Sequence, residues 1–533
     1  MRIRGVDGPL SAQAIAGTHV VMLGIDHDGD DAAIDGLLGF GIERLDHTEG
    51  EHRWLPNRIR FSGVSDPGTN FNPLQTFLWG DYTAKPDHDY TYKVHALDGK
   101  PGTELHSRAC VTLPVHTHEP SVHGVWFNRG VVASQAYADK FHNQHPKDVP
   151  YRAAWIWLSR GLEEALLAFI GQANGPEWSL RGSFYEFEES SVINAFDVAR
   201  HAGADVQLVA MDRPQNREAA AAIEDLVVLW RAHAIIPHNK FLVALHNGEP
   251  VAVWTGSTNI TENGIFGQLN VGHRLADPAI AQQYLDYWHE LLPDPTSGTL
   301  NNWVDRHNPV PAGIDGWPAG VSVVFSPHTH LDALDRYGEL FGSAQDLVCI
   351  TFPFNLDPHF ADQLPGDHPA LRWLLFEDDN TAAAGRALVT DADTELVAGA
   401  VLAEGGFRDW VAELDNPLTT NIDFIHTKFM LVDPLGKDPV VVTGSANFSG
   451  PSTNKNDENM LVIRGDTTVA DLYLTEFMRI FEHYRFRQRV AAPTPGPALA
   501  APSTHAAGPV PWYRKYYDDP ARVKKRMLLA GSG

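Results

Sequence analysis

The segment that says most about the fold is His238-Asn239-Lys240-Phe241-Leu242-Val243, which is followed by Gly256-Ser257-Thr258-Asn259. The same pattern returns as His426-Thr427-Lys428-Phe429-Met430-Leu431, followed by Gly444-Ser445-Ala446-Asn447. Histidine and asparagine are 21 positions apart in both copies, because 259 − 238 and 447 − 426 are equal. The apolar runs at 251–255 and 440–443 precede the Gly-Ser turns in the same way. Such a repeat predicts two copies of one structural unit.

Strand and helix patterns alternate around each copy, which predicts sheets covered by helices. Before the first copy, helices are expected at 153–172, 191–201 and 217–232, and strands at 180–187 and 206–211. Before the second copy, strands are expected at 321–325, 347–354 and 372–376, and helices at 331–341 and 358–364. The two regions therefore predict two similar α/β halves.

The first 120 residues have a different pattern, with short β-prone runs separated by turn residues. Strands are expected at 18–24, 58–63, 89–96 and 109–114. A small β-sandwich accommodates such strands. We therefore predict four parts: an N-terminal β-sandwich at 1–120, a first half at 121–310, a second half at 311–490, and a Pro/Ala-rich linker with a C-terminal arm at 491–533.

Each repeat carries residues suited to binding a phosphate group. Side chains alternate along a strand, so His238 and Lys240 would share one face while Asn239 points to the other. Lysine and amide donors that converge on one point suit an anionic tetrahedral group. Two histidines suit a two-step displacement, in which one attacks phosphorus and the other protonates the leaving oxygen. A chance match or a duplication kept only for packing does not account for two intact His-Lys pairs.

These motifs resemble those of the phospholipase D superfamily, whose signature HxKxxxxD followed by GSxN occurs twice in one chain or once per subunit of a dimer. The resemblance covers about 120–490 and implies two α/β halves, each a mixed sheet flanked by helices, with one active site between them. It implies phosphodiester cleavage through a covalent phosphohistidine, without a metal or cofactor. His238 would be the nucleophile and His426 the general acid and later base, although the motif symmetry leaves the reverse assignment open. The phosphate would be held by Lys240, Lys428, Ser257, Ser445, Asn259 and Asn447.

Two further residues belong to the expected catalytic set by the same resemblance. Asp433 completes the second motif, whereas Leu245 stands at that position in the first. In the family this aspartate supports local structure. Glu458 stands where the family has a carboxylate that bonds a catalytic histidine. If two residues are inserted in the second copy, Gln268 is its counterpart in the first half, so we expect the two histidines to be tuned differently.

The composition sets limits on partners and location. Lys and Arg number 41 against 67 Asp and Glu, which gives a net charge of −26. A surface this acidic disfavours nonspecific nucleic-acid coating and polybasic membrane anchoring. Cys110 and Cys349 form no disulfide framework, and neither a signal peptide nor a membrane-spanning segment is visible. We expect a soluble, cytoplasmic protein; a secreted form whose signal has been removed would look the same.

Other patterns carry less weight. The stretch 26–37 departs from a calcium loop at its sixth and twelfth positions, where Asp31 and Leu37 stand. Histidine pairs at 116–118 and 328–330 lack a full zinc ligand set. We therefore expect no metal site. The aromatic stretch 184–187 is expected in the core, although strand ends there could line the cleft.

The leading hypothesis is a phospholipase D-type phosphodiesterase that cleaves a phospholipid or a similar small diester, with transfer to an alcohol also open. A nuclease of the same superfamily is the alternative enzyme, and a phosphate-binding module without catalysis is the alternative of another class. We expect transient contact with a membrane surface. Since both motifs lie in one chain, a monomer is expected.

Overall fold

The computed structural model describes residues 1–28, 34–130, 134–399, 425–490, 499–500 and 510–532. The chain divides into two compact units. One combines residues 1–119 with 470–533, and the other contains residues 120–469. Residues 405–420, which precede the second His-x-Lys motif, and most of the predicted Pro/Ala-rich linker lie outside the described residues.

The first unit contains two four-stranded antiparallel sheets that share one hydrophobic core. The first sheet has the order β1 (Arg2–Asp7), β2 (Leu10–Ala16), β3 (Val21–His27), β6 (Leu78–Asp81). The second has the order β5 (Glu51–Trp54), β4 (Gly39–Asp46), β7 (Asp89–Asp98), β8 (His106–His116). Inward-facing apolar residues of β2, β3, β4, β7 and β8 fill the space between them, as expected for a sandwich.

The strand expected at 58–63 does not form. Side chains supply the hydrogen bonds there instead of a strand ladder: the Ile59 amide donates to Asn57 Oδ1 at 3.0 Å, and the Phe61 amide donates to Asn72 Oδ1 at 2.8 Å. Asparagine side chains compete with regular structure in this way, so the β-branched and aromatic content was misleading.

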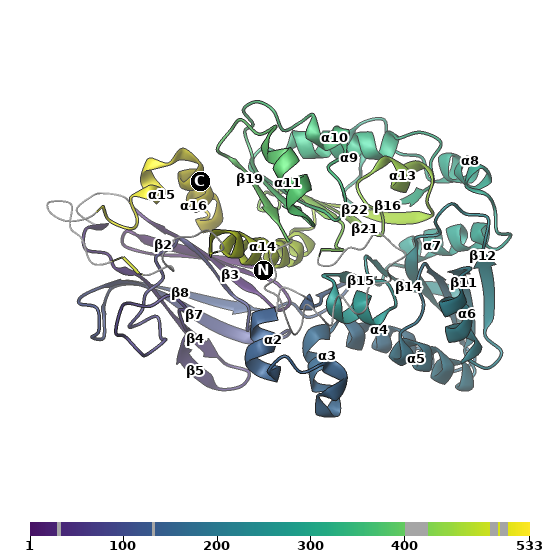
Figure 1. Cartoon of the computed structure of the whole chain (residues 1–533), viewed down its shortest axis with the longest axis horizontal. Coiled ribbons are helices and arrows are strands. Elements are labelled where there is room, and N and C mark those ends of the chain that lie inside the picture. The colour runs from purple at the N-terminus through teal and green to yellow at the C-terminus, as the bar shows by residue number, and fades with distance from the viewer. Residues whose placement is uncertain (29–33, 131–133, 400–424, 491–498, 501–509, 533) are drawn as a thin grey trace. The chain divides into compact units, whose positions relative to one another are not determined.

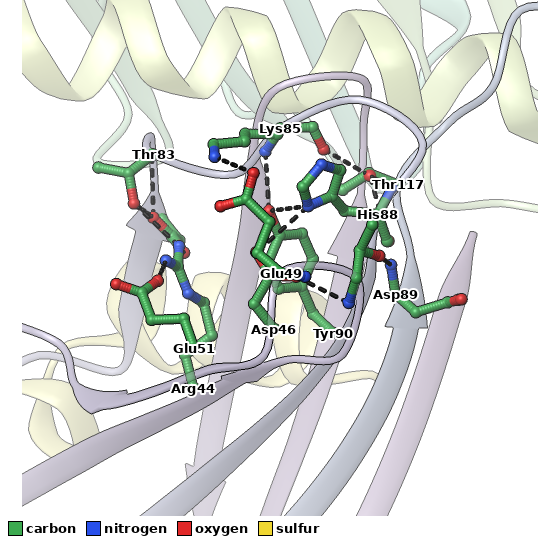
Figure 2. A network of polar contacts seen from close by, with 12 residues as sticks. Arg44, Asp46, Glu49, Glu51, Thr83, Lys85, His88, Asp89, Tyr90 and Thr117 are labelled. Carbon is green, nitrogen blue, oxygen red and sulfur yellow. Dashed lines mark hydrogen bonds and ion pairs between the residues drawn. The ribbon is translucent and has the colours of Figure 1, made fainter.

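A polar network lies at one end of these sheets (Figure 2). The buried Arg44 guanidinium donates to Asp81 and to Glu51, each at 2.7 Å. His88 Nδ1 lies 3.2 Å from the Asp46 carboxylate. Because the buried arginine charge is paired with carboxylates, it does not carry the full cost of desolvation.

The C-terminal helices belong to the same unit. They are α14 (Thr467–Val490), α15 (Lys515–Asp518) and α16 (Pro520–Ala530). Helix α16 packs on β3, where Gly24 lies against the backbone of Leu529 so closely that no Cβ would fit. Trp512 and Tyr513 pack into the sandwich core.

The second unit contains two seven-stranded mixed sheets, visible in the teal and green parts of Figure 1. The first has the order β12 (Val227–Arg231), β11 (Asp205–Met211), β10 (Trp178–Phe184), β13 (Lys240–His246), β14 (Glu249–Gly256), β15 (Val271–Leu275), β9 (His123–Phe127). The second has the order β19 (Thr394–Ala398), β18 (Leu371–Phe376), β17 (Leu347–Phe352), β20 (Phe429–Val432), β21 (Val440–Gly444), β22 (Glu458–Arg464), β16 (Gly320–Ser326).

The two sheets agree strand by strand. In each, the three strands at one edge are parallel to one another, and all other pairings are antiparallel. The repeat seen in the motifs therefore extends to the complete sheet topology, and the expected fold of two similar α/β halves is confirmed.

Helices connect and cover these strands. The first half contains α2 (Ser134–Phe141), α3 (Ala153–Ser159), α4 (Leu162–Gly171), α5 (Ser190–His201), α6 (Pro214–Ala221), α7 (Pro278–Leu291) and α8 (Ser297–His307). The second half contains α9 (Asp332–Ser343), α10 (Pro358–Ala361), α11 (Asp379–Arg386) and α13 (Gly450–Asn454). Helix α7 packs on β14 and also contacts β16 of the second half.

Two helix predictions need correction. The helix expected at 153–172 is broken between α3 and α4, because Arg160 and Gly161 have φ values of 53° and 93°. The helix expected at 217–232 is wrong in its second part: α6 ends at Ala221, and Val227–Arg231 forms edge strand β12. Parallel pairing with β11 is available to that β-branched run, and this tertiary contact outweighs the local pattern.

Candidate active site

The two His-x-Lys segments lie at equivalent places in the two sheets. Lys240 is the first residue of β13, and Lys428 directly precedes β20. The histidines therefore lie in the segments before the strands, not on them as expected. A parallel bridge between Leu269 and Ile425 links the two halves beside His426.

The two imidazole rings face each other across the halves. The ring centroids of His238 and His426 are 6.5 Å apart, and the ring planes differ by 72°. Their exposed fractions are 9% and 5%. Two residues that are 188 positions apart in sequence (426 − 238) are thus brought into one small polar site.

Each histidine is bonded by a residue of the other half. The Nδ1 atom of His238 lies 2.9 Å from Oε2 and 3.0 Å from Oε1 of Glu458. The Nδ1 atom of His426 lies 2.8 Å from Oδ1 of Asn270. One histidine is therefore paired with a carboxylate and the other with a neutral amide.

Asn270, and not Gln268, is the counterpart of Glu458. Asn270 comes 11 positions after Asn259, and Glu458 comes 11 positions after Asn447. The strand registers pair Gly256 with Gly272 and Gly444 with Met460, so no insertion separates the two copies. The expected alignment was wrong by two positions, because similar apolar residues in the two strands allow a shifted match.

The serines of both Gly-Ser turns hold these partners. Ser445 Oγ donates to Glu458 Oε2 at 2.7 Å, and Ser257 Oγ donates to Asn270 Oδ1 at 2.7 Å. Both serines are completely buried. Their hydroxyls are thus engaged with the histidine partners, a contact that sequence reasoning had not assigned to them.

The two lysines are buried beside the histidines. Lys240 Nζ donates to the carbonyl oxygen of His238 at 2.7 Å and lies 5.2 Å from the centroid of the Tyr185 ring. Lys428 is 0% exposed, and its Nζ has no hydrogen-bond acceptor among the described residues. A buried ammonium without an acceptor fits a site for an anion.

Burial lowers the pKa of both lysines, and repulsion by Lys240 adds to the effect at Lys428. Burial lowers the pKa of Lys240 to about 8. Burial, and then repulsion by Lys240, lowers the pKa of Lys428 well below its ordinary value. A bound anion would oppose both effects because it stabilises the protonated lysines.

The histidines and Glu458 are also shifted. Burial, and then the charges of Lys240 and Lys428, lowers the pKa of both His238 and His426 well below the ordinary value. Burial raises the pKa of Glu458 to about 7, against the opposing effect of Lys240. Several groups with perturbed pKa values gathered at one buried place are typical of catalytic sites.

Asn259 is linked to the site through Glu186, the residue after Tyr185. Asn259 Nδ2 donates to Glu186 Oε2 at 2.6 Å, and Arg213 Nη1 donates to Glu186 Oε1 at 2.6 Å. The Oδ1 atoms of Asn259 and Asn447 are buried and lack a hydrogen-bond donor in the described part of the chain. In the stretch 184–187, Phe184 and Phe187 are buried as expected for the core. Tyr185 and Glu186 contact Lys240 and Asn259, which agrees with the alternative expectation for strand ends.

Asp433 lies away from the histidine pair. Its carboxylate accepts hydrogen bonds from the backbone amides of Gln345 (3.0 and 3.1 Å), Asp346 (2.7 Å) and Leu347 (3.0 Å), just before and at the start of β17. Leu245, at the corresponding position of the first half, is a nearly buried apolar residue of β13. These contacts agree with a structural role for the aspartate.

Across the residues that the structure describes, no group of three or more His, Cys, Asp or Glu side chains is arranged to hold a metal ion. His328 Nδ1 pairs with Asp305 at 2.9 Å. Part of the 26–37 stretch, including Asp31, lies outside the described residues.

Comparison with known proteins agrees with the geometry. Residues 399–481 match the family described as "Cardiolipin synthase, PLD-like domain". The mitochondrial cardiolipin hydrolase of Mus musculus is 36% identical over 64 residues, which are 12% of this chain and 27% of that protein. The chain thus spans about a quarter of this curated relative's length.

Three solved structures to which the chain is similar are more distant in sequence. Phosphatidylserine synthase of Haemophilus influenzae is 10% identical, with a TM-score of 0.43 and coverage of 61% of this chain and 85% of that one. Polyphosphate kinase of Porphyromonas gingivalis is 13% identical, with a TM-score of 0.42 and coverage of 68% and 52%. Yeast tyrosyl-DNA phosphodiesterase is 11% identical, with a TM-score of 0.31 and coverage of 57% and 88%.

The fold is an α/β architecture of two phospholipase D-like halves preceded by antiparallel β-sheets. The family match lies over the second His-x-Lys motif, and the first half repeats that motif together with its sheet topology. A PLD-like domain is therefore identified in the second half of the chain.

Proposed function

We propose that the protein is a phospholipase D-type phosphodiesterase that works by histidine chemistry, without a metal or cofactor, on a phospholipid or a similar small diester. The observation that carries the proposal is the pair of imidazoles whose centroids lie 6.5 Å apart, each bonded by the opposite half. A phosphorus atom held between the rings would meet a nucleophile on one side and a proton donor on the other.

His238 is the nucleophile in this proposal. Its Nδ1–H donates to the Glu458 carboxylate, so the lone pair is on Nε2. Nε2 attacks phosphorus and forms a P–N bond, and the bond from phosphorus to the leaving oxygen breaks. The positive charge that develops on the ring is stabilised by the carboxylate of Glu458.

His426 is the general acid and later the base. Burial and the lysines lower the pKa of His426 in the free protein, and the bound phosphodiester anion opposes this effect and favours the protonated ring. The protonated ring gives the Nε2 proton to the leaving oxygen; water then attacks phosphorus, His426 takes a proton from that water, and the P–N bond breaks. The neutral Asn270 orients the ring but adds no charge to stabilise the imidazolium. A histidine with such a partner releases its proton more readily than one paired with a carboxylate.

The phosphate oxygens are held by Lys240, Lys428, Asn259 and Asn447 in this proposal. What supports it is the buried Lys428 ammonium without an acceptor among the described residues; the two asparagines are included because they end the repeated Gly-Ser turns. In a site that excludes water, such donors stabilise the charge of a pentacoordinate phosphorus strongly.

Charge favours a small diester over a nucleic acid. The net charge of −26 repels a polyanion at long range, and Glu186 adds a carboxylate beside Asn259. The matching family and the mouse relative are both named for cardiolipin, a phospholipid with two phosphodiester groups, so cardiolipin belongs among the lipids to test. A nuclease remains the alternative enzyme, and a phosphate-binding module the alternative without catalysis.

The described part of the chain contains no helix long and apolar enough to cross a membrane. We propose separately that a lipid substrate is reached by transient contact with a membrane surface. Because both motifs lie in one chain, the proposed active unit is a monomer.

In the test, purified protein is incubated with four substrates in parallel, each in the presence of EDTA. The substrates are phosphatidylcholine vesicles, cardiolipin vesicles, single-stranded DNA and bis-(p-nitrophenyl) phosphate. Headgroup or phosphatidic acid release without DNA cleavage supports the lipase. DNA cleavage without lipid turnover supports the nuclease. Binding of inorganic phosphate with no turnover of any substrate supports the binding module, and activity that EDTA removes and a divalent cation restores contradicts the histidine mechanism.

A further inference from the structure

A buried hydrogen bond connects the two segments that carry His238 and Glu458. Asn239, between the motif histidine and lysine, accepts at Oδ1 a hydrogen bond from Asn459 Nδ2 at 2.9 Å. Asn459 is the residue that follows Glu458, and both asparagines are completely buried. The neighbours of the histidine and of its carboxylate are thus joined across the two halves.

The bond belongs to a larger buried network. Asn459 Oδ1 accepts hydrogen bonds from Thr255 Oγ1 and, at 3.0 Å, from the Tyr284 hydroxyl. Asn239 Nδ2 donates to the Tyr287 hydroxyl at 3.3 Å, and that hydroxyl donates to the carbonyl oxygen of Ser326 at 2.6 Å. Ser326 pairs with Glu458 in the sheet. The network is therefore connected to the Glu458 backbone twice, through the next residue, Asn459, and through the strand partner Ser326.

The other histidine lacks this support. With the offset of 188 positions (426 − 238), the counterparts of Asn239 and Thr255 are Thr427 and Thr443, and the counterpart of Asn459 is Val271. Valine has no polar side-chain atom. The Oγ1 atoms of Thr427 and Thr443 are both buried without a hydrogen-bond partner among the described residues. Among the described residues, the Asn239–Asn459 link thus has no equivalent beside His426. There Asn270 is held instead by Ser257, by the carbonyl oxygen of Gly264 and by Asn128, all from its own half.

We propose that Asn239 and Asn459 are positioning residues that hold Glu458 against His238 and thereby make His238, rather than His426, the nucleophile. This inference rests on the proposed function. A fully bonded polar network in the interior fixes a single geometry, because any displacement leaves a buried polar group unpaired. The nucleophile needs such a fixed ring, because its Nε2 must stay in line with the leaving oxygen.

The experiment replaces each asparagine by its counterpart from the other half, in Asn239→Thr and Asn459→Val. With bis-(p-nitrophenyl) phosphate we expect kcat to fall about tenfold to a hundredfold while KM stays unchanged, because ring orientation and not substrate binding is lost. The Nδ1–H proton of His238, bonded to Glu458, should give a downfield proton NMR resonance, assigned by its loss in His238→Asn. We expect this resonance to shift or broaden in both variants.

A double mutant separates positioning from a general loss of stability. If Asn239 acts through Glu458, Asn239→Thr combined with Glu458→Gln should be no slower than Glu458→Gln alone. Losses that multiply would overturn the inference. Thr443→Val, at the counterpart of Thr255, is the matched control and should leave kcat and the resonance unchanged, whereas Thr255→Val should perturb both.

The NMR measurement distinguishes a failure of the positioning inference from a failure of the proposed function. A wild-type protein that shows the resonance but cleaves no substrate would count against the phosphodiesterase, while the response of the resonance to Asn239→Thr would still test the positioning. Variants that remain folded by circular dichroism and keep both the resonance and normal kcat would overturn the inference.

Discussion

The Nδ1 atom of His238 lies 2.9 Å from the carboxylate of Glu458, although 220 positions separate the two residues. The other histidine of the site, His426, has the amide of Asn270 at the corresponding place. Two halves with the same sheet topology thus hold two histidines that have different hydrogen-bond partners. This difference gives each of them a separate proposed role, and the predictions below test those roles and the packing that supports them.

The histidine roles can be separated with a substrate whose leaving group needs no proton. In His426→Asn, bis-(p-nitrophenyl) phosphate should still release about one equivalent of p-nitrophenolate per site. The covalent phosphohistidine should then accumulate, since water is no longer activated. His238→Asn should release none. Burst kinetics and intact-protein mass spectrometry check this; a burst in His238→Asn with none in His426→Asn would reverse the assignment.

Anion binding should weaken as the pH rises. Burial lowers the pKa of Lys240 to about 8 and that of Lys428 well below its ordinary value, so free protein loses these protons more easily than exposed lysines do. An anion binds the protonated form, so binding takes up protons, and affinity falls as pH rises through about 8. Calorimetry with tungstate in buffers of different ionisation enthalpy measures the uptake, and a pH-independent affinity would contradict it.

Two threonines at equivalent positions should respond oppositely to the same substitution. Thr255→Val removes the donor to Asn459 and should lower the free energy of unfolding by about 1–3 kcal/mol. Thr443→Val removes a buried hydroxyl without a hydrogen-bond partner among the described residues, and should raise the free energy of unfolding by about 1 kcal/mol. Urea denaturation of both variants provides the comparison, and equal losses would count against the asymmetric network.

Removal of one partner from the buried ion pair beside Glu458 should destabilise the protein. Arg231 Nε and Nη2 donate to Asp457 Oδ2 at 2.9 and 2.8 Å, with both side chains buried. Arg231→Ala leaves a buried carboxylate unpaired and should lower the free energy of unfolding by about 3–5 kcal/mol at neutral pH.

The loss in Arg231→Ala should shrink in acid. Burial raises the pKa of Asp457 to about 6 even with Arg231 present, and removal of the arginine should raise that pKa further. The folded variant then binds a proton that the unfolded chain has released, so its stability falls as pH rises from about 4 towards 7. Denaturation at pH 5 and pH 7.5 checks this; an equal loss at both would show that Asp457 is not the cause.

The repeated motif was sufficient to predict much of the site. The equal spacing of His238 to Asn259 and of His426 to Asn447 predicted two equivalent halves, and the sheet orders agree with that prediction. The residue types alone indicated a phosphate site, because lysines, amides and histidines in a fixed pattern suit few other ligands. The predicted secondary structure was wrong where a short apolar run pairs with a strand distant in sequence, as strand β12 does.

The sequence alone did not predict which residues of the two halves contact each other. Asn270 was missed because its alignment depends on the strand register that Gly256 and Gly272 share. The link from Asn239 to Asn459 spans 220 positions and leaves no periodic signal. Residue order and spacing carry the information for local structure and for the duplication, since both repeat along the chain. The pairing of one histidine with a carboxylate and of the other with an amide arises only when the halves pack together, because each partner is supplied by the opposite half.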